Sequence, residues 1–235
     1  MTHAITLRYF AARGRGQFLR YYLRARGVPF TDERVPLSAD FSAWAAMRDD
    51  RSRAGPFHKL PVLVFDGRLI AETLPIAAFL HTTLGDEATL SADDRVQHEM
   101  LLSSLYMDVT TQIGTLLWAE LLFPGADLRA VAKRTLDQLR QRLAAIERTL
   151  GEWQWLERAR SRPVMIADCL LWEALDIAKQ VFGAQLELPS PTLARCHEDF
   201  AARAVCETLK REHPSPITGR PGEADVIPKI QALLD

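Results

Sequence analysis

The first 85 residues alternate between patterns typical of strands and of helices. Apolar side chains at every second position predict a strand over residues 5–9. Apolar side chains at helical spacing predict a helix over residues 15–26, and Gly27 is a residue type that commonly ends helices. A short strand is then expected over residues 30–35, between two prolines, and a short helix over residues 41–47.

The clearest local signal is a β-hairpin formed by residues 61–65 and 68–71. Asp66-Gly67 separates the two apolar runs and favours a two-residue turn, because both turn positions need a positive φ. Thr73 can cap a helix over residues 74–84. The resulting order, β-α-β-α-β-β-α, predicts a thioredoxin-like α/β domain, in which β-α-β strands pair in parallel and the hairpin adds an antiparallel edge.

The rest of the chain has helical patterns and no comparable strand signal. Long amphipathic stretches predict four helices, over residues 91–122, 127–150, 167–182 and 193–209. We expect an irregular segment over residues 213–228 and one or two helical turns over residues 227–234. The sequence therefore predicts a thioredoxin-like domain over residues 1–85, a linker over residues 86–90 and an all-α domain over residues 91–235.

Composition excludes several classes of protein. The chain has 235 residues, 48% of them apolar, and a formal net charge of −1, so no strong attraction to nucleic acid or to an anionic membrane is expected. No apolar run approaches the ~18–20 residues that cross a bilayer. The three cysteines are too few for a disulfide framework, which makes a reducing, cytoplasmic setting the expectation. The first 85 residues carry 12 basic and 7 acidic side chains, which could favour a small anionic ligand or could be chance.

The chain lacks the common cofactor and metal motifs. Gly14 and Gly16 are not followed by the third glycine of a dinucleotide fingerprint, and the six histidines show no metal-ligand spacing, so no metal site is expected. No cysteine precedes Cys169. A thioredoxin-like domain that exchanges disulfides needs a thiol at the start of its first helix, so the redox function of that fold is excluded. In place of a thiol, this region of the chain has Tyr9 at the end of the first strand, followed by Arg13 and Arg15 at the start of the helix.

Residues 7–15, Leu-Arg-Tyr-Phe-Ala-Ala-Arg-Gly-Arg, resemble the L-x-Y-F-x-x-R-G-R opening of the tyrosine-type cytosolic glutathione transferases, which comprise the alpha, mu, pi and sigma classes. Further matches follow in order along the chain: Lys59-Leu60-Pro61, the Asp66-Gly67 hairpin, Glu72-Thr73 and Ala167-Asp168. The resemblance extends over essentially the whole chain and is strongest to the sigma and alpha classes. It implies a thioredoxin-like domain joined to an all-helical domain.

The resemblance implies that Tyr9 and Arg15 are catalytic. A free thiol has a pKa of about 8.5, so only a few per cent is thiolate at neutral pH. A hydroxyl that donates to the sulfur anion contributes about 1.5–3 kcal/mol of preference for it. Tyr9, at a strand end near a helix start, is placed to make this bond, and Arg15 adds positive potential. The alternative for Tyr9 is an ordinary half-buried strand aromatic.

Glutathione itself would contact the other matched positions. Thr73 offers a backbone N–H and a hydroxyl to the γ-glutamyl carboxylate, and Glu72 offsets the ammonium; the alternative is a plain helix cap. Leu60 would pair its backbone with the cysteinyl unit like an added strand. Pro61 is expected to follow a cis peptide bond, and the alternative is a trans proline that opens an edge strand.

Three further contacts with glutathione follow from the resemblance. Trp44 and Arg48 match the positions that hold the glycine carboxylate in sigma-like members, although an amphipathic surface helix would also explain them. Lys59 either approaches the bound peptide or is solvated. Asp108 matches an acid that reaches the γ-glutamyl amine bound by the neighbouring subunit, which implies a two-fold homodimer; a solvated helix charge is the alternative.

The predicted function is transfer of glutathione to small hydrophobic electrophiles, with glutathione as co-substrate and no other cofactor. Phe10 is expected in the acceptor site, together with the long helix after Met100 and the apolar tail over residues 226–234, which could form a lid. Two alternatives remain open. The same site could isomerise substrates or reduce peroxides, or the protein could be a non-catalytic, ligand-carrying relative.

Overall fold

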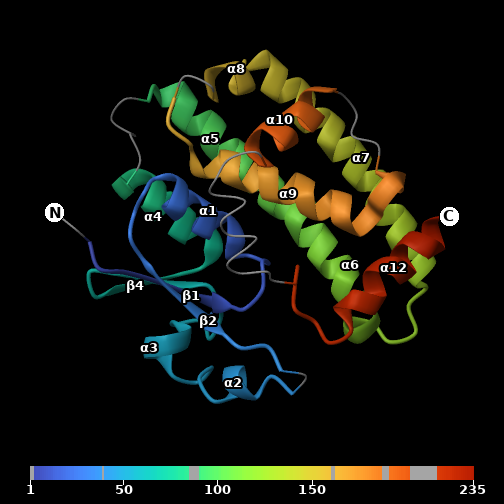
Figure 1. Cartoon of the computed structure of the whole chain (residues 1–235), viewed down its shortest axis with the longest axis horizontal. Coiled ribbons are helices and arrows are strands. Elements are labelled where there is room, and N and C mark those ends of the chain that lie inside the picture. The colour runs from blue at the N-terminus through green and yellow to red at the C-terminus, as the bar shows by residue number, and fades with distance from the viewer. Residues whose placement is uncertain (1–2, 39, 85–89, 160–161, 187–190, 202–215) are drawn as a thin grey trace.

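A computed structural model describes residues 3–38, 40–84, 90–159, 162–186, 191–201 and 216–235 of the chain. The blue and cyan N-terminal part contains a four-stranded sheet, and the green to red remainder is helical (Figure 1). The expected linker, residues 86–90, lies outside the described residues except for its last residue, so the domain boundary stays a prediction.

The sheet has the strand order β2-β1-β3-β4. Its strands are β1 (Ile5–Phe10), β2 (Thr31–Val35), β3 (Val62–Phe65) and β4 (Arg68–Ala71). β1 pairs in parallel with β2 and antiparallel with β3, and β3 pairs antiparallel with β4. Asp66 and Gly67 form the turn between β3 and β4 with φ values of 48° and 83°. The predicted hairpin and thioredoxin-like topology are confirmed.

Four helices accompany the sheet: α1 (Gln17–Ala25), α2 (Ser42–Ala45), α3 (Arg51–Ala54) and α4 (Thr73–Leu84). α1 and α4 lie on the side that faces the helical domain, and α2 and α3 lie on the other side (Figure 1). The sequence did not predict α3, a single turn capped by the Asp50 carboxylate, which accepts the Ser52 N–H. Thr73 is the first residue of α4 rather than the residue before it.

The remaining helices are α5 (Ala92–Ser104), the π-helical turn η2 (Leu105–Thr110), α6 (Thr111–Leu122), α7 (Leu128–Glu152), α8 (Trp155–Ala159), α9 (Ile166–Phe182), the 3-10 turn η3 (Gly183–Gln185), α10 (Pro191–Ala201) and α12 (Glu223–Leu234). α9 packs against α1, α5, α10 and α12. The expectation for residues 213–228 was partly wrong, because α12 already begins at Glu223 and continues through Pro228. Residues 202–209 of the fourth predicted helix lie outside the described residues.

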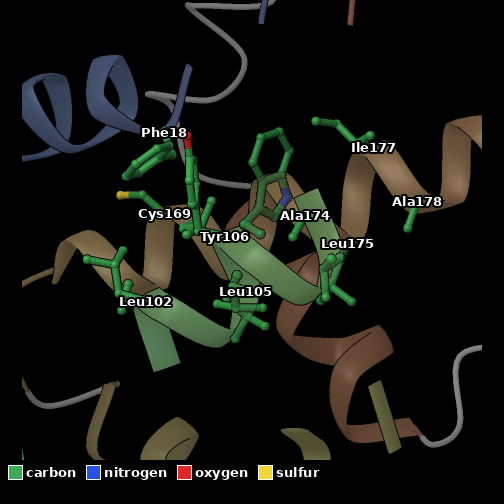
Figure 2. Packing of buried hydrophobic residues seen from close by; sticks show 14 of the residues in the cluster. Phe18, Leu102, Leu105, Tyr106, Cys169, Ala174, Leu175, Ile177 and Ala178 are labelled. Carbon is green, nitrogen blue, oxygen red and sulfur yellow. The ribbon is translucent and has the colours of Figure 1, made fainter. Parts of the chain in front are cut away.

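The two domains share one hydrophobic core. Phe18 of α1 belongs to the same buried cluster as Leu105 and Tyr106 of η2 and Cys169 of α9. Figure 2 shows these side chains where the two domains meet. Burial of this apolar surface opposes separation of the domains. This packing therefore stabilises the arrangement of the two domains around any site between them.

The described parts of the chain hold neither a membrane-spanning helix nor a cluster of metal ligands. No helix there is long and apolar enough to cross a membrane. Within the same residues, no group of three or more His, Cys, Asp or Glu side chains could hold a metal ion.

A buried histidine pair joins α4 to α5 and makes stability depend on pH. The rings of His81 and His98 stack with centroids 3.9 Å apart, and His98 is fully buried. Burial, aided by the charge of His81, lowers the pKa of His98 to about 3. Asp168 opposes this shift and Arg162 adds to it. The unfolded chain therefore binds a proton at this residue below pH ~6.5 that the folded chain does not.

We expect the free energy of unfolding to fall by about 1.4 kcal/mol per pH unit from this residue as pH drops below ~6.5. His98→Leu should remove that component, and denaturant unfolding between pH 4 and 7 measures it. His58→Asn, at an exposed position, is the control. An unchanged slope in His98→Leu would contradict the prediction.

Candidate functional site

A cavity of about 310 Å³ lies between the two domains. The thioredoxin-like domain contributes Tyr9, Phe10, Gly14, Arg15 and Leu60 to its wall. The helical domain contributes Thr110, Thr111, Gly114, Thr115, Trp118, Leu122 and Ile177, and the C-terminal segment contributes Ile217 and Thr218. The cavity therefore brings the predicted catalytic pair together with Leu60 and the predicted acceptor residue Phe10.

Tyr9 stands near the end of β1 with its ring against the following loop. A Cβ atom on Gly14 would lie 2.4 Å from the Tyr9 hydroxyl oxygen, and one on Gly16 would lie 2.6 Å from a ring carbon. Only glycine lets the loop approach the ring this closely. Gly14 and Gly16, which do not complete a dinucleotide-binding motif, thus allow the close approach of the loop to the Tyr9 ring.

The Tyr9 hydroxyl oxygen accepts a hydrogen bond of 2.9 Å from the backbone N–H of Arg15. Because that bond occupies an oxygen lone pair, the hydroxyl proton stays available for donation into the cavity. Burial raises the pKa of Tyr9 above its ordinary value, and the Arg15 N–H opposes that shift. The phenol therefore stays protonated at neutral pH and keeps a proton that it can donate.

Arg15 and Thr73 are linked through Tyr106, a residue that sequence reasoning missed. The Arg15 guanidinium lies over the Tyr106 ring, 5.9 Å from its centroid. The Tyr106 hydroxyl donates to the Thr73 hydroxyl oxygen at 3.2 Å. Tyr106 lies in η2, and π-helical turns occur frequently at functional sites. In the sequence, one tyrosine among apolar helix residues predicts only core packing. The π-helical turn, which becomes visible in the structure, is the feature that draws attention to Tyr106.

Glu72 and Thr73 occupy the start of α4. Glu72 has a positive φ of 72°, a conformation that costs free energy in a residue with a side chain. Thr73 is buried at the helix N-terminus, where backbone N–H groups lack partners within the helix and favour an anion. The pair is thus oriented for a charged ligand, although neither residue lines the cavity beside Tyr9.

The Leu60–Pro61 peptide bond is cis, as predicted. Leu60 is buried and lines the cavity just before β3. Lys59 is exposed, and its backbone N–H donates to the Ala54 carbonyl at 3.0 Å. The backbone of Leu60 is therefore held at the cavity wall, while the Lys59 side chain reaches solvent.

Trp44 and Arg48 lie outside that wall. Trp44 of α2 is half-buried and meets the Phe10 ring edge-on at 5.5 Å. Arg48 is exposed, and its guanidinium is 3.9 Å from the Asp49 carboxylate. The structure thus connects Trp44 to the site through Phe10 and leaves Arg48 on the surface.

Asp108 and Tyr9 line different cavities of the chain. Asp108 of η2 borders a polar cavity of about 260 Å³, together with Gln112, Gln138, Gln141 and Arg142. Its carboxylate accepts the Ser104 hydroxyl at 3.2 Å. Asp108 therefore does not join the site of its own chain.

The C-terminal residues that line the cavity differ from those predicted. No residue of α12 lines the cavity, so the expectation for residues 226–234 was wrong. α12 packs against α7, α9 and α6 (Figure 1), because its apolar face completes the helical core. Ile217 and Thr218, in the stretch expected to be irregular, line the cavity instead.

Comparisons with known proteins agree with this architecture. Residues 16–83 match the family model described as glutathione S-transferase, N-terminal domain. Probable glutathione S-transferase 5 of Caenorhabditis elegans is 26% identical over 180 residues, covering 74% of this chain and 77% of the relative. Probable glutathione S-transferase 7 of the same organism is also 26% identical, but the alignment covers only 53% of this chain and 56% of that relative.

A solved structure of similar fold is the monomeric Na-GST-3, a glutathione S-transferase from the hookworm Necator americanus. Its TM-score is 0.72 at 19% identity, and the match covers 90% of this chain and 98% of the other. At this identity the likeness shows the fold. Residues 16–83 therefore match the glutathione S-transferase N-terminal domain, and the fold of the described residues is that of solved glutathione S-transferases.

Proposed function

We propose that this chain is a tyrosine-type glutathione S-transferase of sigma-like or alpha-like character. The observation that carries the proposal is that Tyr9 lines the cavity and that its hydroxyl oxygen accepts the Arg15 N–H at 2.9 Å. This arrangement leaves a hydroxyl donor for the sulfur of glutathione. The thiol loses its proton to solvent, and the thiolate attacks an electrophilic carbon. A C–S bond forms as the leaving group departs.

In this proposal Tyr9 stabilises the thiolate and Arg15 adds positive potential beside it. Thr73 binds the γ-glutamyl carboxylate at the start of α4, and Glu72 offsets the ammonium. The backbone of Leu60, fixed by Pro61, pairs with the cysteinyl unit. Trp44, Arg48 and Lys59 surround the glycine end. Glutathione is the co-substrate, no metal or redox cofactor takes part, and the cytoplasm is the proposed compartment.

The acceptor occupies the apolar side of the cavity, near Phe10, Trp118 and Ile177. Three of the four threonine hydroxyls that line the cavity donate to helix carbonyls: Thr110 to Leu105, Thr111 to Tyr106 and Thr115 to Thr111. The fourth, Thr218, donates to the Glu223 carboxylate. Because these hydroxyl protons already take part in hydrogen bonds within the protein, the cavity offers a ligand mainly apolar surface and hydrogen-bond acceptors. This lining supports a small hydrophobic electrophile.

Conjugation of glutathione to a chlorinated nitrobenzene tests the proposal, with the uncatalysed rate subtracted and glutathione binding measured by calorimetry. Turnover with binding is the expected result. Binding without turnover across an electrophile panel would favour a ligand-carrying protein. Turnover confined to peroxides or isomerisable substrates would favour the other glutathione-dependent reactions on the same site.

We also propose a homodimer in which Asp108 reaches glutathione bound by the other subunit. Apolar side chains that are at least half exposed, Val96, Met100 and Met107, lie on α5 and η2 near Asp108. Phe57, before β3, is 60% exposed. Clustered exposed apolar groups mark interaction surfaces. A second such cluster, Leu121, Leu122 and Phe123, lies at the end of α6, and the presence of Asp108 beside the first cluster is the reason to place the second copy there.

We expect the wild type to sediment as a dimer of the 26.5 kDa chain and Met100→Glu to sediment as a monomer, because burying the new charge in an interface costs several kcal/mol. Analytical ultracentrifugation at micromolar concentration measures this. Leu121→Glu, exposed at the far end of α6, should leave the dimer intact. A monomeric wild type, like the hookworm structure, would contradict the proposal.

A further inference from the structure

The segment Pro216–Glu223, here named the strap, holds the loop that follows β1. The Arg13 N–H donates to the Pro216 carbonyl at 2.9 Å, and the Gly14 N–H donates to the Ile217 carbonyl at 2.6 Å. The next N–H along the chain, that of Arg15, donates to the Tyr9 hydroxyl oxygen at 2.9 Å. Two consecutive amides are thus fixed by the strap, and the third is aimed at the phenol.

Glu223 folds the strap. Its buried carboxylate accepts the Ile217 N–H at 2.6 Å, the Thr218 N–H at 2.7 Å and the Gly219 N–H at 2.9 Å. The Thr218 hydroxyl donates to it as well, at 2.5 Å. Glu223 is also the first residue of α12, where the helix dipole favours a negative charge. One carboxylate therefore gathers four donors and sets the course of the strap.

The strap is seated against both domains. The buried Arg220 guanidinium donates to the Leu117 carbonyl of α6 at 2.9 Å. Gly219 has a φ of 70°, and a Cβ atom there would lie 2.0 Å from the Leu37 side chain, in the loop after β2. The red segment leading into α12 is this connection (Figure 1). The strap cannot shift without disturbing α6, the loop after β2 and the loop after β1.

We propose that Glu223 is a positioning residue for Tyr9: by folding the strap it holds the Arg13 and Gly14 amides so that the Arg15 N–H stays on the phenol oxygen. This inference rests on the proposed function. An N–H bond to the phenol oxygen polarises the O–H group and makes it a stronger donor to a thiolate. Without the strap, the loop amides are free to leave the phenol, and thiolate stabilisation weakens.

The test compares Glu223→Gln with Asp225→Asn. Both remove one negative charge from the first turn of α12, but Asp225 is exposed. Gln keeps the size of Glu223 but replaces one acceptor oxygen with an NH2 group, which donates hydrogen bonds and cannot accept them from the strap. Two readouts apply: amide hydrogen exchange of residues 12–16 without glutathione, and the pH profile of kcat/KM for conjugation.

Glu223→Gln should accelerate exchange at residues 13–15 and move the midpoint of the pH profile upward by about 0.5–1 unit, the effect of one weakened hydrogen bond. Asp225→Asn should match the wild type in both. Unchanged exchange in Glu223→Gln would overturn the proposal. Faster exchange with an unmoved midpoint would also overturn it, because the strap would then be purely structural.

If Glu223→Gln does not fold, Thr218→Val takes its place, because it removes only the hydroxyl donor to Glu223 and keeps the side-chain shape. The same two shifts are expected at smaller size, and their absence counts against the strap. A wild type without any conjugating activity overturns the proposed function instead. Hydrogen exchange then tests only whether the strap holds the loop after β1. Faster exchange in the variant supports that role, and unchanged exchange refutes it.

Discussion

Replacing Tyr9 with phenylalanine should slow glutathione conjugation about 10- to 150-fold, the effect of losing a hydroxyl donor that contributes about 1.5–3 kcal/mol to a charged acceptor. The phenylalanine ring retains the packing against Gly14 and Gly16, so the fold should persist. Binding of glutathione should change little, because the backbone of Leu60 and the start of α4 are untouched. The loss should therefore fall on kcat more than on KM.

The pH profile identifies the cause of that loss. A donor that stabilises the anion lowers the thiol pKa, so its removal should move the midpoint of kcat/KM upward by about 1–2 units, toward the value of free glutathione. Tyr22→Phe, fully buried in α1 and outside the cavity wall, is the matched control. Equal rates and equal midpoints for Tyr9→Phe and wild type would remove the basis of the proposed mechanism.

Local physics made the thioredoxin-like topology predictable. The alternation of Ile5 and Leu7 and the Asp66-Gly67 turn are short-range signals, and their outcome depends little on the rest of the chain. The position of Tyr9 at the end of β1 follows from the same signals. The start of α12 was harder, because Pro228 suggested an irregular segment, whereas the Glu223 carboxylate organises the residues before the helix.

Residues joined across the sequence could not be predicted in this way. Thr73 and Tyr106 are 33 positions apart, and Arg13 and Glu173 are 160 apart. Nothing in either segment specifies its partner until the domains pack. Glu173 did carry a signal, since an acid within the apolar run of α9 must either face solvent or find a buried cation. Asp108 was expected to reach glutathione in the neighbouring subunit, and that role stays a prediction, because a contact between subunits depends on the dimer and not on this chain alone.

Glu173→Ala should reduce the free energy of unfolding by about 3–5 kcal/mol, because it leaves the buried Arg13 guanidinium without its main partner. Arg13 Nε and Nη2 donate to the two Glu173 carboxylate oxygens at 3.0 and 2.7 Å. Burial raises the pKa of Glu173 above its ordinary value, and Arg13 opposes that shift. Asp176, 2.7 Å from Arg13, remains in the variant and favours the lower end of the range.

Chemical denaturation of Glu173→Ala, with the exposed Glu152→Ala as control, measures this loss; a change below about 1 kcal/mol would contradict the prediction.

Replacing both Arg13 and Glu173 distinguishes a contribution of the ion pair to stability from a role in positioning the loop beside Tyr9. Arg13→Leu with Glu173→Leu should recover much of the stability, since a buried ion pair can be exchanged for apolar packing at little cost. The backbone N–H of residue 13 would still reach the strap, but the loop would have lost its bidentate tie to α9. Recovered stability with reduced conjugation would therefore assign the ion pair a positioning role beside Tyr9, whereas recovery of both would make it structural alone.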